Sequence, residues 1–398
     1  MVAYDTRPRR PVGGRAFLVI ALIVAVLLVG LRFLTQSGPL REDYGRGTAS
    51  GPIAASSGQG PDRVPPASRG GTPTSVVPVG ARVPVARRVS ALKRENGIQI
   101  YLHETAAGGA TDHTVAILDY VVGLGANSIG LSFPIYTDGA RPTTVMSGAE
   151  TPSPARVRSF VAQAHARGLR VMLRPIIDEK NIAQTPGEWR GSIRPVDVPR
   201  WFDSYARTLD SYFGTGADEF VLAAELTSLG GEARQWARLE SDARRQFRGA
   251  LSYAFNWDTT MASSTDPDLF GLDLYFPVDL GDDATVDQLA EVLRSAIEGQ
   301  PTAVRRRLVV QEVGIPALSG MYRAPWDWGA SGRTIKEEIQ GNWFAAACRA
   351  VRRTGTQGIY YWMLDSNVDP LLARPDSQPA GSFIGRLGER SIRACYAP

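Results

Sequence analysis

Two glutamates occupy equivalent positions in two strand-like segments that lie far apart in the chain. Glu225 closes the apolar segment of residues 219–226, and Glu312 closes that of residues 308–314. Each interrupts a run that would otherwise be buried as a parallel strand, where an ionised, unpaired carboxylate is costly. Two acids facing one cavity can cleave a glycosidic bond, because one protonates the leaving oxygen and the other attacks or activates water. This pair therefore indicates carbohydrate chemistry.

A structural role is the competing interpretation for each acid. A single glutamate at a strand end can pair with a buried arginine such as Arg174 and contribute only to folding. That explanation becomes weaker when two separate strands end in the same way. We therefore favour the catalytic interpretation for Glu225 and Glu312.

Further polar and aromatic residues stand at the ends of the strand-like segments. Carboxylates and amides hydrogen-bond sugar hydroxyls, and aromatic faces stack on pyranose rings, so this composition is typical of a sugar cleft. His103 and Asp178 belong to this set and are candidate substrate-binding residues. The set comprises His103, Glu104, Tyr136, Asp138, Arg174, Asp178, Glu225, Asn256, Asp258, Tyr275, Glu312, Trp362 and Asp365.

Other chemistries find little support in the sequence. His103, His113 and His165 show no His-x-His spacing, so we expect no catalytic metal. None of the three lysines ends a strand, which disfavours Schiff-base chemistry. The glycines after the seventh and eighth strands form no convincing phosphate-binding turn. We therefore expect no cofactor.

The segments that carry these residues alternate between strand-like and helix-like patterns. Residues 154–167 are amphipathic and are followed by Gly168, which is typical of a helix C-terminus. Eight strands over about 300 residues favour an α/β fold of the (β/α)8 TIM-barrel type. The predicted strands are residues 97–103, 128–135, 169–177, 219–226, 249–256, 269–275, 308–314 and 358–364.

Two details refine the predicted barrel. Residues 257–268 are too few for a full crossover helix, so that helix should be reduced or missing. A doubly wound open sheet is the alternative fold, but no glycine-rich dinucleotide turn follows the first strand. The barrel domain should span residues 93–398.

The N-terminal part of the chain has a different composition. Residues 16–34 form an apolar run that is long enough to cross a bilayer, and four arginines precede it. We expect an uncleaved signal anchor there, a cytoplasmic tail over 1–15 and a disordered Pro/Gly/Ser-rich linker over 35–92. A cleaved signal peptide is the alternative. The protein should then be a single-pass protein of the cell membrane whose catalytic domain is extracytoplasmic.

Charge and cysteine content add two expectations. The net charge of +4 is diffuse and no nucleic-acid motif appears, so nucleic acid is not an expected partner. Cys348 and Cys395 both lie in the part expected to be exported, where a disulfide can form. Since sequential barrel helices are neighbours, we favour a Cys348–Cys395 disulfide over two buried thiols.

With both acids on the fourth and seventh strands, the sequence resembles the clan A retaining glycoside hydrolases. Within that clan it is most similar to the β-mannanase-type barrels of glycoside hydrolase family 113, over residues 95–395. The most specific motif is the run of residues 247–258, which ends in Asn-Trp-Asp. The other motifs are Trp189-Arg-Gly191, Trp201-Phe-Asp-Ser-Tyr205, Glu225-Leu226, Gly271-Leu-Asp-Leu-Tyr-Phe-Pro277, Gln311-Glu-Val-Gly314, Pro325-Trp326 and Tyr361-Trp362.

The resemblance implies a role for several of these residues. Glu225 would be the acid/base and Glu312 the nucleophile of a double displacement. The two carboxyl groups would lie about 5–5.5 Å apart, and the acid/base would have a raised pKa. Tyr275 would orient the nucleophile, and Asn256 would hold substrate or the acid/base. Trp362 would form the floor of the −1 sugar subsite, and Trp189 and Arg190 would line further subsites.

The sequence also departs from the family pattern. Ile176 stands where a histidine is common after the third strand, and Ala223-Ala224 replaces a Gly-Thr type pair before Glu225. These changes leave the two acids intact but bear on specificity for mannan. The expected activity is hydrolysis of a β-linked, mannan-like cell-surface polysaccharide. The alternatives are a non-catalytic barrel that binds polysaccharide or scaffolds wall assembly, and a transglycosylase that uses the same residues.

Overall fold

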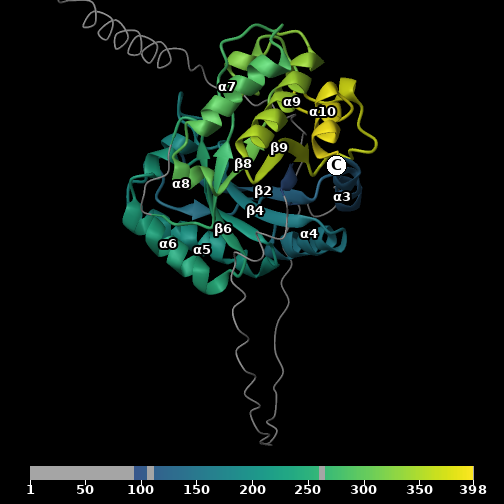
Figure 1. Ribbon diagram of the computed structural model, residues 1–398. Coiled ribbons are helices and arrows are strands. Elements are labelled where there is room, and N and C mark those ends of the chain that lie inside the picture. The colour runs from purple at the N-terminus through teal and green to yellow at the C-terminus, as the bar shows by residue number, and fades with distance from the viewer. Residues whose placement is uncertain (1–93, 105–111, 260–264, 398) are drawn as a thin grey trace, which may run out of the picture.

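Eight parallel strands close into a barrel in the computed structural model, which describes residues 94–104, 112–259 and 265–397. The barrel closes because β1 pairs in parallel with both β2 and β9 (Figure 1). This closure confirms the predicted TIM barrel and excludes the open, doubly wound sheet. The strands are β1 (Glu95–Tyr101), β2 (Ser128–Thr137), β4 (Arg170–Ile177), β5 (Glu219–Ala224), β6 (Ala250–Asn256), β7 (Leu269–Asp273), β8 (Leu308–Val313) and β9 (Gly358–Asp365).

Helices surround the barrel and cover its outer face. The predicted helix after the second strand is α4, whose first turn is capped by Ser153 and which is followed by Gly168 at φ +75°. The described residues between β6 and β7 contain no helix, as their number predicted. The helices are α3 (Thr114–Gly123), α4 (Pro154–Ala166), α5 (Val198–Asp210), α6 (Ala233–Gln246), α7 (Val286–Glu298), α8 (Thr302–Arg305), α9 (Glu337–Thr354) and α10 (Leu387–Tyr396).

Several short elements lie in the loops at the carboxyl ends of the strands, and two of them follow β2 and β4. β3 (Val145–Met146) pairs antiparallel with the end of β2, an addition that the sequence pattern did not predict. The 3-10 helix η1 (Arg190–Ser192) lies in the long connection from β4 to α5. Both elements follow strands whose ends carry predicted site residues, so they shape the surroundings of those residues.

The buried apolar side chains form two clusters, one inside the barrel and one between the barrel and the helices. Along β4, Val171 and Leu173 belong to the large core under the helices, whereas Met172 and Ile176 belong to a second apolar cluster. This alternation places every second side chain in the interior, as expected for a closed parallel barrel. The interior cluster consists of Met172, Ile176, Val221, Ala224, Ala250, Ala254, Leu269, Val309 and Tyr360, with Tyr101 and Trp362 against it.

A buried polar network fills the barrel where the strands begin. Arg170 donates to Glu219 at 2.8 Å and lies 3.3 Å from Glu95. Tyr360 donates its hydroxyl proton to Glu95 at 2.7 Å. Burial outweighs the nearby guanidinium and raises the pKa of Glu95 to about 7. One arginine is thus shared by two buried carboxyl groups.

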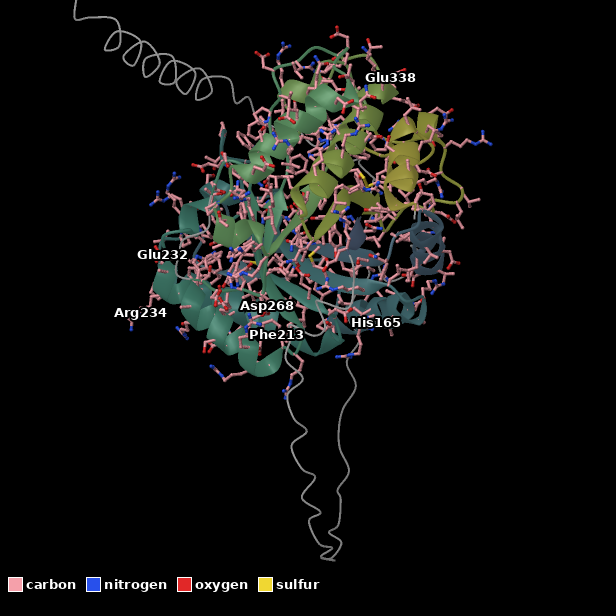
Figure 2. All side chains as sticks on the ribbon, in the orientation of Figure 1. His165, Phe213, Glu232, Arg234, Asp268 and Glu338 are labelled. Carbon is pink, nitrogen blue, oxygen red and sulfur yellow. A yellow bond between two sulfur atoms is a disulfide. The ribbon has the colours of Figure 1, made fainter. Side chains whose placement is uncertain are left out.

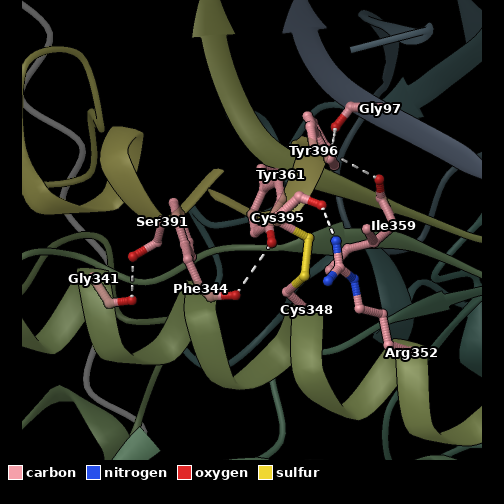
Figure 3. Close-up of a disulfide and its surroundings, with 10 residues drawn as sticks. All are labelled: Gly97, Gly341, Phe344, Cys348, Arg352, Ile359, Tyr361, Ser391, Cys395 and Tyr396. Carbon is pink, nitrogen blue, oxygen red and sulfur yellow. Dashed lines mark hydrogen bonds between the residues drawn. A yellow bond between two sulfur atoms is a disulfide. The ribbon is translucent and has the colours of Figure 1, made fainter. Parts of the chain in front are cut away.

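A disulfide joins the last two helices (Figure 3). Cys348 of α9 and Cys395 of α10 are bonded, with their Cα atoms 5.9 Å apart, which confirms the predicted pairing. Arg352 donates to the carbonyl oxygen of Cys395 at 2.6 Å. The Tyr396 hydroxyl donates to the carbonyl oxygen of Gly97 at 2.6 Å, so α10 is also held against β1.

The predicted tail, anchor and linker of residues 1–15, 16–34 and 35–92 lie outside the described residues. Within the described part of the chain, no helix has both the length and the apolar character needed to cross a membrane. The structure therefore bears on the barrel domain, and the prediction of an N-terminal anchor stays a prediction.

Candidate active site

Glu225 directly follows β5 at the carboxyl end of the barrel. Its backbone has φ +56°, the only positive φ of a non-glycine residue in the described part of the chain. Such a conformation costs on the order of 1–3 kcal/mol and is often found at active sites. The register of β5 against β6 shifts between Val221 and Ala224, and the Glu225 N–H donates to the Ala254 carbonyl at 3.0 Å. Such an irregularity changes the direction of nearby side chains, and here it immediately precedes Glu225.

Glu312 lies within β8, and its side chain is only 5% exposed. Tyr275, two residues beyond β7, donates its hydroxyl proton to Glu312 Oε2 at 2.7 Å. Arg174 donates from Nη1 to Glu312 Oε1 and from Nη2 to Asp273 Oδ2, the latter at 2.5 Å. Both oxygens of the Glu312 carboxyl group are therefore held, one by a guanidinium and one by a hydroxyl.

Arg174 belongs to the strand-end residues that were singled out in the sequence, but no catalytic or substrate-binding role was predicted for it. It is completely buried inside β4, and it binds Glu312 as the structural interpretation of that acid allowed. Yet the same carboxylate also accepts from Tyr275 at a strand end, which a purely structural ion pair does not require. An arginine within an otherwise apolar strand was the available signal.

Glu225 has a different electrostatic environment from Glu312. Its side chain is 11% exposed, and burial raises its pKa to about 7. The charge of Glu312 adds to this rise, whereas Arg190, whose Nη1 lies 3.3 Å from Glu225 Oε2, opposes it. A carboxyl group of this kind holds a proton near neutral pH. The arrangement thus offers one proton donor and one hydrogen-bonded carboxylate.

A second group of predicted residues gathers at the ends of β1, β4 and β9. The Tyr101 hydroxyl donates to Asp178 Oδ2 at 3.1 Å. The Tyr101 ring lies edge-on to Trp362 with centroids 6.1 Å apart, and 5.0 Å from the ring of His103. The sequence predicted His103, Asp178 and Trp362 but missed Tyr101, because it lies within a strand pattern and not at its predicted end.

Asn256 and Trp189 lie at other parts of the rim. The Asn256 amide donates to Asp258 Oδ1 at 3.0 Å, and its Oδ1 accepts from the backbone of Trp257 at 3.0 Å. Its side chain is therefore engaged by its own loop. The Trp189 ring packs over Gly191, where an added Cβ would lie 2.2 Å from the ring, so this close approach requires glycine.

An aromatic cluster at the same end of the barrel was not predicted as a functional feature. Trp257 stacks on Trp326 with centroids 6.1 Å apart and an interplanar angle of 18°. Phe276 meets Trp257 edge-on at 5.3 Å. All three rings are half-buried and follow β6, β7 and β8 in the chain. Their partly exposed faces suit contact with sugar rings.

The histidines are spread apart in the fold. His113 lies 3.8 Å from Asp369, and His165 lies on α4 at the periphery, 2.9 Å from Asp218 (Figure 2). Among the residues that the structure describes, no group of three or more His, Cys, Asp or Glu side chains is arranged to hold a metal ion. The geometry of the site instead centres on carboxyl groups and guanidiniums.

Known proteins resemble this chain over most of the barrel. The family model for Glycoside Hydrolase Family 113 matches residues 103–375. A β-1,4-mannanase of that family, solved as a complex, has a TM-score of 0.64 at 19% identity, covering 77% of this chain and 99% of that chain. The β-mannanase AaManA from Alicyclobacillus acidocaldarius, in complex with ManMIm, has a TM-score of 0.64 at 22% identity and covers 77% and 97%. No curated protein matches the sequence.

Proposed function

Because this chain belongs to Glycoside Hydrolase Family 113 and is a clan A glycoside hydrolase, we propose that it cleaves β-linked, mannan-like polysaccharide with retention of configuration. The observation that carries this proposal is the contrast between two carboxyl groups at the same end of the barrel. Burial raises the pKa of Glu225 to about 7, whereas Glu312 accepts hydrogen bonds from Arg174 and Tyr275. A retaining glycosidase needs one acid of each kind.

The two acids then act in two steps. Glu312 attacks the anomeric carbon and forms a glycosyl ester, while Glu225 protonates the oxygen of the departing sugar. Glu225, now ionised, takes a proton from water, whose oxygen attacks the anomeric carbon and releases Glu312. Each residue returns to its starting state, and the product keeps the β configuration. This route requires the two carboxyl groups to lie about 5–5.5 Å apart.

The substrate class is proposed from two supports. Two of the solved structures that match this chain are named as β-mannanases, and the stacked pair Trp257–Trp326 offers aromatic faces at the same end of the barrel as the acids. Aromatic rings contact the apolar faces of sugars in extended polysaccharide sites. We therefore expect a β-linked mannan or a related polymer as the substrate.

The location is proposed from the sequence. Residues 16–34 would anchor the protein in the cell membrane, and the linker of residues 35–92 would carry the barrel to polysaccharide at the cell surface. A disulfide between Cys348 and Cys395 suits an exported domain. Fractionation of cells expressing the full chain, with protease added outside, would test both orientation and anchoring.

Purified full-length protein, incubated with a panel of β-linked polysaccharides that includes mannans, tests the activity. We expect reducing ends to appear with the parent chain and to be lost in Glu312→Gln, which keeps the shape of the side chain. Proton NMR of the first products should show the β anomer before mutarotation. Release of the α anomer would refute retention, and glycan binding without turnover on any polymer would favour a binding protein.

A further inference from the structure

Each of the two arginines in the site is shared between two carboxyl groups. Arg174 binds Asp273 and Glu312, and both pairs are almost completely buried. Arg190 lies between Glu179, 3.1 Å from its Nε, and Glu225, 3.3 Å from its Nη1. The site therefore holds four carboxyl groups against two guanidiniums. Buried carboxylates that outnumber the positive charges repel one another, so this excess favours the protonated form of a carboxyl group in the site.

The two arginines differ in how closely they hold their partners. Both contacts of Arg174 are short, and the side chains of Arg174 and Asp273 are fully inaccessible to solvent. On the other side, Arg190 is 19% exposed and Glu179 is 25% exposed, and both contacts of Arg190 exceed 3 Å. Arg190 thus makes only a long contact with Glu225, and the carboxyl group of Glu179 partly compensates the positive charge of Arg190.

The local fold fixes Arg190 in this place. It is the first residue of η1, and its neighbour Trp189 packs over Gly191 with the backbone N–H bonded to Ser192 Oγ at 2.9 Å. The Arg190 backbone N–H also faces Glu179 Oε1 at 3.5 Å. Because the turn leaves little freedom, the guanidinium remains between the two glutamates.

We propose that Arg190 and Glu179 form a positioning pair for Glu225, in which Arg190 orients the carboxyl group and Glu179 neutralises enough of the Arg190 charge for Glu225 to keep its proton. The proposal rests on the role given to Glu225 in the proposed function. Neither residue needs to touch the reacting atoms for this effect. Glu179 acts only through Arg190 and Glu225.

The charges that face Glu225 make the expected effects opposite in sign. Arg190 and Arg174 lower the pKa of Glu225, whereas Glu312 and Glu179 raise it. Removing the charge of Glu179 should therefore lower the pKa of Glu225, and removing that of Arg190 should raise it. Two neighbouring residues that shift one group in opposite directions distinguish charge tuning from a loss of local structure.

Direct titration of Glu225 in the full-length chain tests this pair. Glutamate labelled with 13C at the side-chain carboxyl is followed by NMR against pH, and the signal of Glu225 is the one lost in Glu225→Gln. We expect Glu179→Gln to lower the titration midpoint by about one pH unit and Arg190→Met to raise it by a similar amount. Arg190→Lys, which keeps the charge, should stay nearer to the parent value.

Glu188→Gln is the matched control. Glu188 lies in the same loop, is 27% exposed and contacts Arg194 and Ser192, so its loss should leave the midpoint of Glu225 unchanged. Shifts of both test variants in one direction, or shifts no larger than that of the control, would overturn the proposal. If Arg190→Met does not fold, the sign for Glu179→Gln against the control decides the question.

The titration separates this inference from the proposed function because it needs no substrate. If turnover is found, the alkaline limb of kcat/KM should move down in pH for Glu179→Gln and up for Arg190→Met. If no polymer is cleaved but the midpoints shift as expected, the pair stands and the glycosidase activity fails. If cleavage occurs with unshifted midpoints, the activity stands and the pair is refuted.

Discussion

Glu95 gives a test of barrel stability that is independent of any substrate. It is buried where β1 begins, and it shares Arg170 with Glu219 while accepting a hydrogen bond from Tyr360. Burial is the largest influence on this carboxyl group and raises its pKa to about 7. Glu95→Gln replaces it with a neutral side chain of nearly the same shape, which resembles the protonated acid.

The magnitude follows from linkage between proton binding and folding. A glutamate with a pKa near 4.5 when unfolded and about 7 when folded binds its proton more tightly in the native state. Its contribution to stability is fully present below the unfolded pKa and is lost as pH rises through about 7. Between pH 5 and pH 8 the parent chain should lose about 2–3 kcal/mol that Glu95→Gln does not lose.

Urea denaturation of both proteins at pH 5 and pH 8 measures this difference. Relative to the parent, Glu95→Gln should be more stable by about 2–3 kcal/mol at pH 8 than at pH 5. Glu338→Gln, an exposed residue on α9 (Figure 2), controls for the loss of a surface carboxylate and should show no such change. An equal stability difference at both pH values would show that Arg170 keeps Glu95 ionised throughout, which refutes the reasoning.

Three further predictions concern the site and the disulfide. Tyr275→Phe removes the hydroxyl that donates to Glu312 and should lower kcat/KM by about 10- to 100-fold. The measurement uses the polymer that the parent cleaves, and an unchanged midpoint of thermal unfolding is the control. The kcat/KM of the parent should fall about tenfold per pH unit above pH 7, because Glu225 must be protonated, and a profile flat to pH 9 would contradict this. Cys348 and Cys395 are separated by 47 positions in the sequence, and replacing both by serine removes the link between them. The free energy of unfolding, measured by urea denaturation, should fall by about 2–4 kcal/mol, and reduction of the parent should have the same effect.

Much of the barrel could be predicted from the sequence because its strands are continuous apolar runs. Each of the eight predicted strands is present within two residues of its expected bounds. The shortness of residues 257–268 predicted a reduced or missing helix, because the number of residues limits what can form, and the described residues of this connection contain none. The disulfide was predicted from the neighbourhood of successive helices in a barrel, which the closed sheet provides.

The site was only partly predictable, because it depends on where strands become irregular. The register shifts of β5 before Glu225 and of β7 against β8 at Asp273 re-aim side chains without any signal in the apolar pattern. Arg174 was visible as an arginine in a buried strand, but its two partners come from distant parts of the chain. Asn256 was predicted to hold substrate or the acid/base, and its amide donates to Asp258 in its own loop. Which hydrogen-bond partner each of these side chains finds depends on the packing of segments that are distant in the sequence.

Ile176 stands at the position where the family resemblance led us to expect a histidine, and its surroundings account for the apolar side chain. Ile176 is buried in the interior cluster with Met172 and Val221, and Trp362 and Tyr101 pack against that cluster. A neutral histidine there would need hydrogen-bond partners that apolar neighbours do not supply, so isoleucine is the side chain that this environment accommodates. The two acids make their contacts through other side chains. Arg174, on the same strand as Ile176, binds Glu312, and Arg190 lies 3.3 Å from Glu225. The apolar packing at this position and the polar contacts of the acids are thus made by different side chains, so an isoleucine here is compatible with both acids keeping their partners.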